Sequence, residues 1–331
     1  MTVISTPHAY DEPALFVDLK PGFDIPLHLK VEGFNFAGSV KIKAAAEMVE
    51  RAEREGLLHP DSILIESSSG NLGVALSVIA ADRGYPFVCV VDPRCNLATR
   101  QLMETYGARV HQVTRPDPEN GFLGARLEHV RRLCDSDPRY LWLNQYANPG
   151  NWQAHHRRTG PEILREFPDL DVLFVGAGTT GTLMGCARFF AEQARRVHVV
   201  AVDVVGSVTF GGPPARRMIP GLGTSVRPPQ LDASIIDEVV MVAEPDTVRT
   251  CHRLARRGFL FGGSTGTVVS GASAWLARHA ERGGAPLTTV GIAPDFGERY
   301  LDTLYHANWV ADIYGDDVLP PEPGHASRIS A

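Results

Sequence analysis

The stretch Asn35-Phe36-Ala37-Gly38-Ser39-Val40-Lys41-Ile42-Lys43 leads from a turn directly into a strong helical pattern. After Lys41, apolar residues recur at helical spacing while glutamates and arginines occupy the other face, which predicts an amphipathic helix. Ser39 is the expected N-cap, so Lys41 falls in the first turn, where the helix dipole disfavours a positive charge. A neutral or covalently bound amine would remove this conflict. The alternative is that Lys41 and Lys43 are simply solvated.

A glycine-rich turn follows a short apolar run later in the chain. Residues 172–175 fit a buried strand, and a helical pattern covers 183–194; between them lies Gly176-Ala177-Gly178-Thr179-Thr180-Gly181-Thr182. Bare backbone N–H groups at a helix N-terminus suit a phosphate. The same glycine spacing satisfies the dinucleotide fingerprint, and Asp203 stands where that fingerprint needs an acidic residue for a ribose. Taken alone, this turn leaves both interpretations open.

A second polar loop connects an expected strand over 63–66 to a helix that runs to about residue 83. It reads Glu66-Ser67-Ser68-Ser69-Gly70-Asn71-Leu72-Gly73. Its hydroxyls and the helix N-terminus suit a carboxylate, and the Asn71 amide can both donate and accept hydrogen bonds. The alternative is an ordinary polar loop between a strand and a helix.

Three motifs, in this order, resemble the cysteine synthase and cystathionine β-synthase family of pyridoxal-phosphate enzymes of fold type II. They are Asn-x-x-Gly-Ser-Val-Lys, Ser-Gly-Asn-x-Gly and Gly-Thr-x-Gly-Thr, and the similarity runs over residues 16–295. The resemblance implies that Lys41 binds the cofactor as an imine and that Asn71 hydrogen-bonds its ring hydroxyl. It implies a cradle for the cofactor phosphate formed by Gly178, Thr179, Thr180, Gly181 and Thr182. It also implies a site for the substrate α-carboxylate formed by Ser67, Ser68, Ser69 and Gln145.

Ser264, within the run 262–266, matches the serine that faces the pyridine nitrogen in that family. A neutral hydroxyl leaves this nitrogen largely unprotonated, so the cofactor is a shallower electron sink than it would be beside a carboxylate. Loss of a group from Cβ is then favoured. The expected chemistry is therefore β-elimination and β-replacement, not transamination.

Composition excludes several classes of protein. The chain has 331 residues and 44% hydrophobic composition, enough for one large or two moderate domains. The net charge of −6 comes without a block of like charge, so no nucleic-acid partner is expected, and no apolar run approaches the ~18 residues of a membrane helix. The five cysteines form no Cys-x-x-Cys pair, which argues against a zinc site and against a disulfide framework. Residues 1–11 lack a signal-peptide pattern, so the expected location is the cytoplasm.

Strand and helix patterns alternate from residue 62 onward with short connections, which predicts an α/β fold with parallel sheets. We expect two open, doubly wound sheets with the cofactor in the cleft between domains. Residues 20–22 are expected to form a turn, and one long helix to end near residue 167. The resemblance implies a small substrate-closing domain at about 45–147 and a large domain formed by 1–44 and 148–315. The proline-rich segment 316–331 is expected to be a flexible tail.

The departures from the family pattern bear on substrate choice. Thr179-Thr180 replaces a single threonine followed by glycine, and Lys43 replaces an arginine. Tyr146 follows Gln145, where phenylalanine is common. A tyrosine hydroxyl near the reacting Cβ suits a polar leaving group or nucleophile, whereas the alternative is a core tyrosine whose hydroxyl meets the backbone.

A basic loop over residues 215–227 replaces a shorter, more neutral loop of the O-acetylserine enzymes. Guanidinium groups bind phosphates and carboxylates bidentately, so we expect one or more of the arginines to hold substrate. The candidates are Arg216, Arg217 and Arg227, together with Ser225. The alternative is a solvated basic loop.

These departures are most similar to the branch of the family that joins O-phospho-L-serine to L-glutamate on the way to 2,3-diaminopropionate. In the implied reaction Lys41 removes the α-proton, phosphate leaves, and the glutamate amine adds to Cβ. The alternatives are a cysteine synthase that uses sulfide, a threonine or serine dehydratase, a cofactor-binding regulatory protein without turnover, and a nicotinamide oxidoreductase. The resemblance also favours a homodimer.

Overall fold

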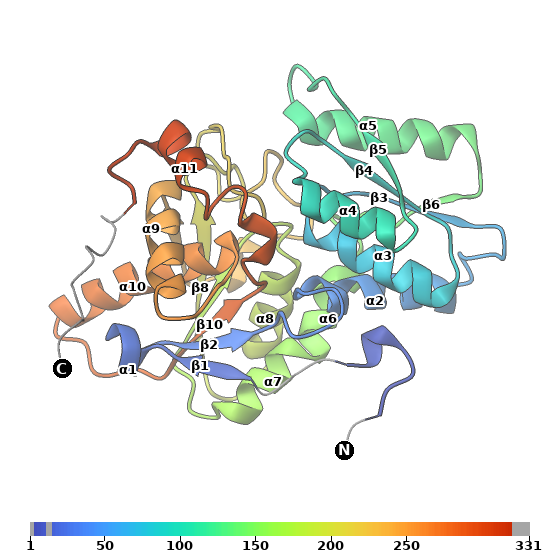
Figure 1. Ribbon diagram of the computed structural model, residues 1–331. Coiled ribbons are helices and arrows are strands. Elements are labelled where there is room, and N and C mark those ends of the chain that lie inside the picture. Colours follow the sequence, from blue (N-terminus) through green and yellow to red (C-terminus); the bar gives the residue numbers. More distant parts are fainter. Residues whose placement is uncertain (1–2, 11–14, 320–331) are drawn as a thin grey trace, which may run out of the picture.

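The chain folds into two α/β units, each built on its own sheet, and the two units lie side by side (Figure 1). The computed structural model describes residues 3–10 and 15–319. Most of the predicted flexible tail, residues 320–331, lies outside the described part, as do residues 1–2 of the predicted N-terminal segment and its residue 11. The expected fold class is confirmed: helices alternate with strands in both sheets.

The larger sheet has six strands in the order β1-β2-β10-β7-β8-β9. β1 pairs with β2 in the antiparallel sense, and all other neighbours are parallel. β2 and β10 are neighbours in this sheet although they come from the N-terminal and C-terminal parts of the chain. The strands are β1 Phe16–Asp18, β2 His28–Val31, β7 Val172–Gly176, β8 His198–Val204, β9 Glu238–Val242 and β10 Thr289–Ala293.

Helices cover both faces of this sheet because successive strand residues point to opposite sides. In β7, Phe174 packs with α9 and α10 on one face, whereas Leu173 and Val175 pack with α7 and α8 on the other. In the sequence, strands that are buried on both faces appear as unbroken runs of apolar residues. The helices of this half are α1 Lys20–Phe23, α6 Pro149–Arg157, α7 Thr159–Glu166, α8 Gly181–Ala191, α9 Glu244–Ala255, α10 Gly263–Glu281 and α11 Ala307–Tyr314. Short 3₁₀ turns occupy Pro7–Ala9, Ala233–Ile235 and Glu298–Tyr300.

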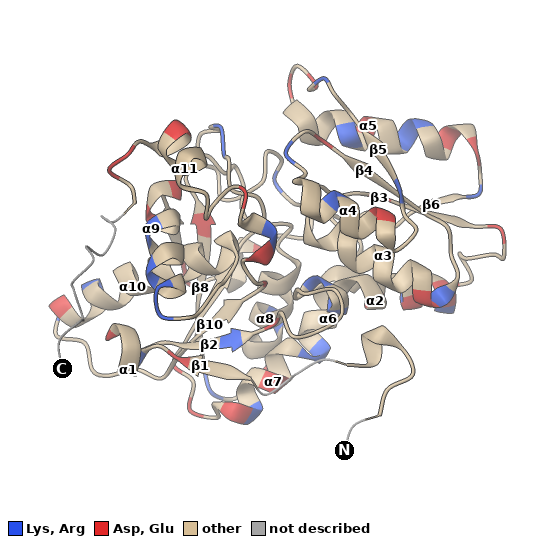
Figure 2. Cartoon of the chain, in the orientation of Figure 1, with Lys and Arg blue, Asp and Glu red and all other residues tan. Residues whose placement is uncertain are grey.

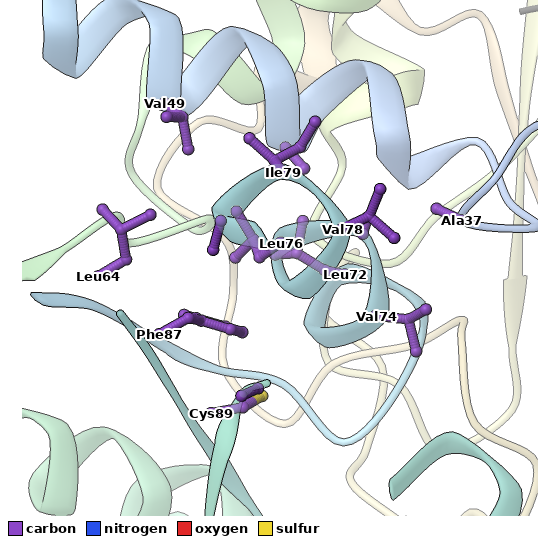
Figure 3. Close-up of a cluster of buried hydrophobic side chains, with 14 of the residues drawn as sticks. Ala37, Val49, Leu64, Leu72, Val74, Leu76, Val78, Ile79, Phe87 and Cys89 are labelled. Atoms are coloured by element: carbon purple, nitrogen blue, oxygen red, sulfur yellow. The ribbon is translucent and has the colours of Figure 1, made fainter. Parts of the chain in front are cut away.

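The smaller sheet has four parallel strands in the order β5-β4-β3-β6. Figure 3 shows Leu76 and Ile79 of α3 lying between Val49 of α2 and Phe87 of β4, so this side of the sheet is closed by a dry apolar layer. The bounds are α2 Lys41–Arg54, β3 Ile63–Ser67, α3 Asn71–Arg83, β4 Phe87–Val91, α4 Leu97–Thr105, β5 Arg109–Gln112, α5 Gly121–Ser136 and β6 Tyr140–Trp142. α5 covers the opposite face and carries both acidic and basic residues along its length (Figure 2).

Helix α2 links the two halves because it packs against both α3 and α6. The proposed small domain, residues 45–147, contains the whole four-stranded sheet, and its boundary at 45 falls inside this continuous helix. We propose that movement of this domain toward the larger one closes the site between them. Among the described residues, no helix is both long enough and apolar enough to cross a membrane.

Three local expectations are wrong. Residues 20–22 do not form a simple turn but lie in helix α1, which ends at Asp24 in a left-handed conformation, φ 56°. The expected long helix is two helices, α6 and α7, because Arg158 leaves the helical region with φ −122° and ψ −67°. The N-cap of α2 is Val40, and Ser39 instead accepts a 3.4 Å hydrogen bond from the Lys41 N–H through its side chain.

Lys43 is not solvated, contrary to that alternative. It is 1% exposed and its Nζ lies 2.9 Å from a carboxylate oxygen of Glu32 and 2.8 Å from Oε2 of Glu162. Lys30 joins the same group, with Nζ 3.0 Å from Glu162 Oε2. These two lysines and two glutamates thus form a buried cluster of opposite charges between β2, α2 and α7, which we call the Lys43 cluster.

Candidate active site

One cavity lies between the two sheets and is lined from both of them. Ligands of open α/β sheets bind at the carboxyl ends of the strands, and this cavity follows the ends of β3, β4 and β7. It gathers most of the predicted site residues: Lys41, Ser67, Ser68, Ser69, Asn71, Gln145, Tyr146, Gly178, Thr179, Thr180, Gly181, Thr182, Arg217, Ser225 and Ser264. Arg216 and Arg227 are exposed and are not among its lining residues, so their part in binding stays a prediction.

Lys41 begins helix α2 at the floor of this cavity. Burial lowers the pKa of its amine from the usual 10.5 to about 8, and the charge of Asp295 opposes that shift. Burial disfavours the charged form of an amine, so a substantial neutral fraction exists near neutral pH. A neutral amine is a nucleophile toward a carbonyl and a base toward a C–H proton.

Chemical labelling of the cofactor-free protein can measure this shift. We expect acetylation of Lys41 by acetic anhydride to rise with pH with a midpoint near 8, because only the neutral amine reacts. Peptide mass spectrometry after pulse labelling gives the midpoint for each lysine. Lys41 in the urea-unfolded protein is the reference and should label with the more alkaline midpoint of a free lysine. A Lys41 midpoint that is the same in the folded and the unfolded protein would contradict the lowered pKa.

The turn from Gly176 to Thr182 has the conformation of an anion cradle. Thr180 is left-handed, φ 66°, immediately before helix α8, which turns successive N–H groups toward one side. The Thr180 hydroxyl is buried and has no hydrogen-bond partner within the described part of the chain. Asn151 fixes the neighbouring Thr179, donating to its hydroxyl at 3.0 Å. An orphaned hydroxyl, open N–H groups and a helix N-terminus together fit a phosphate.

Two glycines are required where a second loop crosses this turn. A side chain at Gly178 would meet the carbonyl oxygen of Gly221 at 2.7 Å, and one at Gly221 would collide with the Ser264 hydroxyl. The backbone of the 219–223 loop therefore approaches both the cradle and Ser264. This places the predicted ring-nitrogen partner, Ser264, and the predicted phosphate cradle on one wall of the cavity.

The serine loop divides its hydroxyls between structure and binding. Ser68 accepts hydrogen bonds from the N–H groups of Gly70 and Gly73, which fixes the start of α3. Ser67 Oγ is buried and lacks a partner among the described residues, and Gln145 donates to the Ser67 carbonyl at 2.9 Å. Ser67 and Gln145 are therefore held together with hydrogen-bonding capacity left for a carboxylate. Ser69 supports a different part of the wall.

Asn71 is held by two residues that the sequence reasoning did not single out. Its amide donates to Asp295 Oδ2 at 2.8 Å and accepts from Arg299 at 2.7 Å. Tyr300 also donates to Asp295, at 2.6 Å. This network orients the amide so that its second N–H remains available to a ligand hydroxyl or phenolate. Asp295 lies two residues after the end of β10, and this position just beyond a strand was the signal available in the sequence.

Three arginines line the mouth of the cavity, and two of them were not predicted. Arg126 is buried, with Nε 3.2 Å from Asp92 Oδ2 and Nη1 donating to Ser69 Oγ at 3.1 Å. Arg94 pairs with the same carboxylate at 3.1 Å. Arg217 comes from the opposite wall and donates to Ser225 Oγ at 3.1 Å. Among the residues that line the cavity, these three guanidinium groups face one carboxylate, Asp92, so this part of the wall is predominantly basic.

The nicotinamide alternative finds no support in the position of Asp203. This residue is fully buried within β8 and is not among the residues lining the cavity. To hold a ribose, the Asp203 carboxylate would need to be accessible from the cavity at the carboxyl ends of the strands. The glycine spacing therefore fits a phosphate cradle better than a dinucleotide fingerprint, whose acidic partner is not among the lining residues.

Comparison with known proteins agrees with this geometry. Residues 12–295 match the family described as pyridoxal-phosphate dependent enzyme. The chain is 42% identical over 286 residues to the N-(2-amino-2-carboxyethyl)-L-glutamate synthase of Ralstonia nicotianae, covering 86% of this chain and 83% of that protein. It is 41% identical over 300 residues to the synthase of the same name from Cupriavidus metallidurans, covering 90% and 87%. A hydrogen sulfide-producing enzyme from Fusobacterium nucleatum superimposes with a TM-score of 0.83 at 28% identity, covering 91% and 99%.

Proposed function

The chain belongs to the family of pyridoxal-phosphate-dependent enzymes, and from that premise we propose that it performs a β-replacement on O-phospho-L-serine with L-glutamate. The products are N-(2-amino-2-carboxyethyl)-L-glutamate and phosphate, and we place the reaction in the supply of 2,3-diaminopropionate for siderophore or peptide-antibiotic synthesis. The observation that carries this proposal is the arginine-rich mouth of the cavity. Phosphoserine brings a phosphate dianion and a carboxylate, and glutamate brings two carboxylates, which match an excess of positive charge.

The residues of the cavity fit pyridoxal phosphate. Lys41 would bind its aldehyde carbon, the 178–182 turn its phosphate, Ser264 its ring nitrogen and Asn71 its ring hydroxyl. Bound pyridoxal phosphate supplies an electron sink that acidifies the α-proton of an amino acid and eases departure of a group from Cβ. Ser264 offers a hydroxyl rather than a carboxylate, which suits replacement at Cβ better than transamination.

Lys41 does the proton transfer. As a free amine, Lys41 has a lowered pKa, which leaves it able to accept the α-proton of the substrate near neutral pH. The resulting ammonium lies in the field of Asp295, which stabilises the charge until the proton returns to Cα. The same group therefore removes and restores one proton on one face of the substrate.

The two substrates meet different walls. Ser67 and Gln145 would hold the α-carboxylate of phosphoserine, and Arg126 with Tyr146 would receive its phosphate as the Cβ–O bond breaks. Arg217 and Ser225, on the opposite wall, would hold a carboxylate of glutamate while its amine adds to Cβ. The interaction of a buried guanidinium group with a phosphate is strong and oriented, since two parallel N–H···O hydrogen bonds form at once.

A cysteine synthase that uses sulfide is the second candidate, because it would share the whole cofactor apparatus. Sulfide carries no carboxylate and needs no guanidinium, so this candidate leaves Arg217 and Ser225 without a ligand. Rapid mixing separates the two. We expect phosphoserine to change the absorbance of the bound cofactor and glutamate to restore it, with phosphate released. Restoration by sulfide and no response to glutamate would contradict the proposal, and no change with any amino acid would favour a non-catalytic protein.

Substitution of Arg126 tests the phosphate assignment. For Arg126→Gln we expect kcat/KM for phosphoserine to fall by a factor of at least ~30, because truncating one partner of a buried charge pair costs about 2–5 kcal/mol. Arg131→Gln, on the exposed face of the same helix, is the matched control and should behave like the wild type. Equal kinetics for the two variants would show that Arg126 does not bind the phosphate of phosphoserine.

We also propose that the protein is a cytoplasmic homodimer. Phe34, Phe36, Leu97 and Leu301 are each about half exposed or more. Contacts among Asn96, Arg299 and Ala37 hold their segments next to one another. An exposed apolar group of this kind is typical of an interface. Light scattering in solution gives the mass, and a monomer at working concentration would contradict the assembly.

A further inference from the structure

Helix α6 lies against the phosphate cradle and presents two side chains to it, one turn apart. Asn151 donates to Thr179, and His155 Nε2 lies 3.2 Å from the Thr182 hydroxyl. The approach is close because a side chain at Gly185, in α8, would collide with the backbone of α6 and with His155. His155 is fully buried. The imidazole is therefore fixed against one of the hydroxyls assigned to the phosphate.

A second hydrogen bond connects the other side of the imidazole to the Lys43 cluster. His155 Nδ1 lies 3.0 Å from the Thr159 hydroxyl, and Lys43 Nζ donates to that same hydroxyl at 3.5 Å. The break between α6 and α7 at Arg158 places Thr159 at the start of a new helix and between these two groups. The result is a buried chain, Lys43–Thr159–His155–Thr182, that ends at the cradle.

The donors and acceptors of these groups allow one direction of the chain that leaves Thr182 able to donate to an anion. A lysine ammonium has hydrogens only, so Thr159 accepts from it, and the Thr159 hydrogen can be given to His155 Nδ1. In that arrangement the imidazole is protonated at Nε2 and donates to the Thr182 oxygen. The Thr182 hydrogen is left free to point at an anion. In the opposite direction His155 would take the Thr182 hydrogen, and the hydroxyl could not donate to a phosphate.

We propose that His155 is a positioning residue that, as a neutral imidazole protonated at Nε2, holds the Thr182 hydroxyl as a donor toward the cofactor phosphate. Burial, together with the charges of Lys41, Lys43 and Arg158, keeps the pKa of His155 well below its usual range, in agreement with a neutral ring. The inference rests on the proposed assignment of the 178–182 turn to the phosphate. It does not depend on which amino acids are the substrates.

Cofactor binding and the phosphorus signal test the proposal independently of turnover. For His155→Leu we expect the dissociation constant of pyridoxal phosphate from the apoenzyme to rise about tenfold or more, the value of a hydrogen bond to a charged group. The ³¹P resonance of the bound phosphate should shift as well. His156→Leu is the matched control, since His156 is the next residue of α6 and pairs with Glu192 at the surface. Equal affinities and equal ³¹P shifts for the two variants would overturn the proposal.

A double-mutant cycle with Thr182→Val separates positioning from general damage to α6. Thr182→Val alone should weaken binding by a similar factor, and His155→Leu should add little in its presence, because both act through one hydroxyl. A full additional loss would overturn the proposal. If Thr182→Val leaves affinity unchanged, the cradle assignment fails with it, whereas loss with Thr182→Val but not with His155→Leu rejects the positioning role alone.

Thr159→Val covers the case in which His155→Leu does not fold. It keeps the shape of the side chain and the imidazole, but removes the hydroxyl that sets the direction of the chain. We expect affinity to fall severalfold and the ³¹P resonance to move in the same direction as for His155→Leu. Wild-type values of both would contradict the proposal. His155→Gln, whose amide can donate in place of Nε2, should recover part of the affinity.

Discussion

Replacing Lys41 by alanine should abolish the imine absorbance of the purified protein and lower kcat by about 10²–10⁴ or more. The variant loses the amine that we propose both holds the cofactor and moves the α-proton. No neighbouring lysine can take over, because Lys43 points into the buried cluster with Glu32 and Glu162. Steady-state release of phosphate from phosphoserine in the presence of glutamate measures the loss.

Lys20→Ala is the control for this experiment, since Lys20 is exposed and remote from the cavity. It should retain the absorbance and the wild-type rate. Pyridoxal phosphate should still bind to Lys41→Ala, because the contacts that we propose for the 178–182 turn, Ser264 and Asn71 do not involve the lysine. Turnover above about a tenth of the wild-type rate in Lys41→Ala would be incompatible with its role as base.

The second large effect is expected on stability. Lys43→Met should lower the free energy of unfolding by about 3–5 kcal/mol, because removing one member of a buried ion cluster leaves an uncompensated charge in the interior. Both Glu32 and Glu162 would lose their ion pair with Lys43, while the ion pairs with Lys30 would remain. Urea denaturation of the apoenzyme, followed by circular dichroism, measures the change without a contribution from cofactor binding.

Lys20→Met provides the matched control and should change stability by less than about 0.5 kcal/mol, as is usual at exposed sites. The double variant Lys43→Met with Glu162→Gln should recover part of the loss, since it also removes a negative charge that Lys43 had paired. A loss below about 1 kcal/mol for Lys43→Met would show that the cluster is hydrated or rearranges.

Acid should weaken the same cluster. Burial raises the pKa of Glu162, but the charges of Lys43 and Lys30 and their hydrogen bonds outweigh it, so the pKa is lowered. A carboxyl group whose pKa is lower in the folded state stabilises the protein above its unfolded pKa and loses that contribution as the pH falls through the folded one. The Lys43→Met variant should therefore show a shallower loss of stability on acidification than the wild type.

Much of this protein could be predicted from local sequence. The apolar run before Gly176 and the glycines after it specify a strand, a turn and a helix start, because each depends on neighbours within a few residues. The alternation of such units predicts parallel sheets, and the motifs around Lys41, Asn71 and Thr179 identify the cofactor family, as the match over residues 12–295 confirms.

Only the tertiary structure decided which side chains of distant segments meet. Arg126 enters the cavity while Arg216 stays outside it, although both read as basic residues of a polar stretch. Lys43 is buried because β2 and α7 bring glutamates to it, and His155 reaches Thr182 because Gly185 lets α6 approach α8. Spacing along a chain determines local conformation, whereas burial and pairing depend on contacts between elements that are remote in sequence, and no local pattern encodes them.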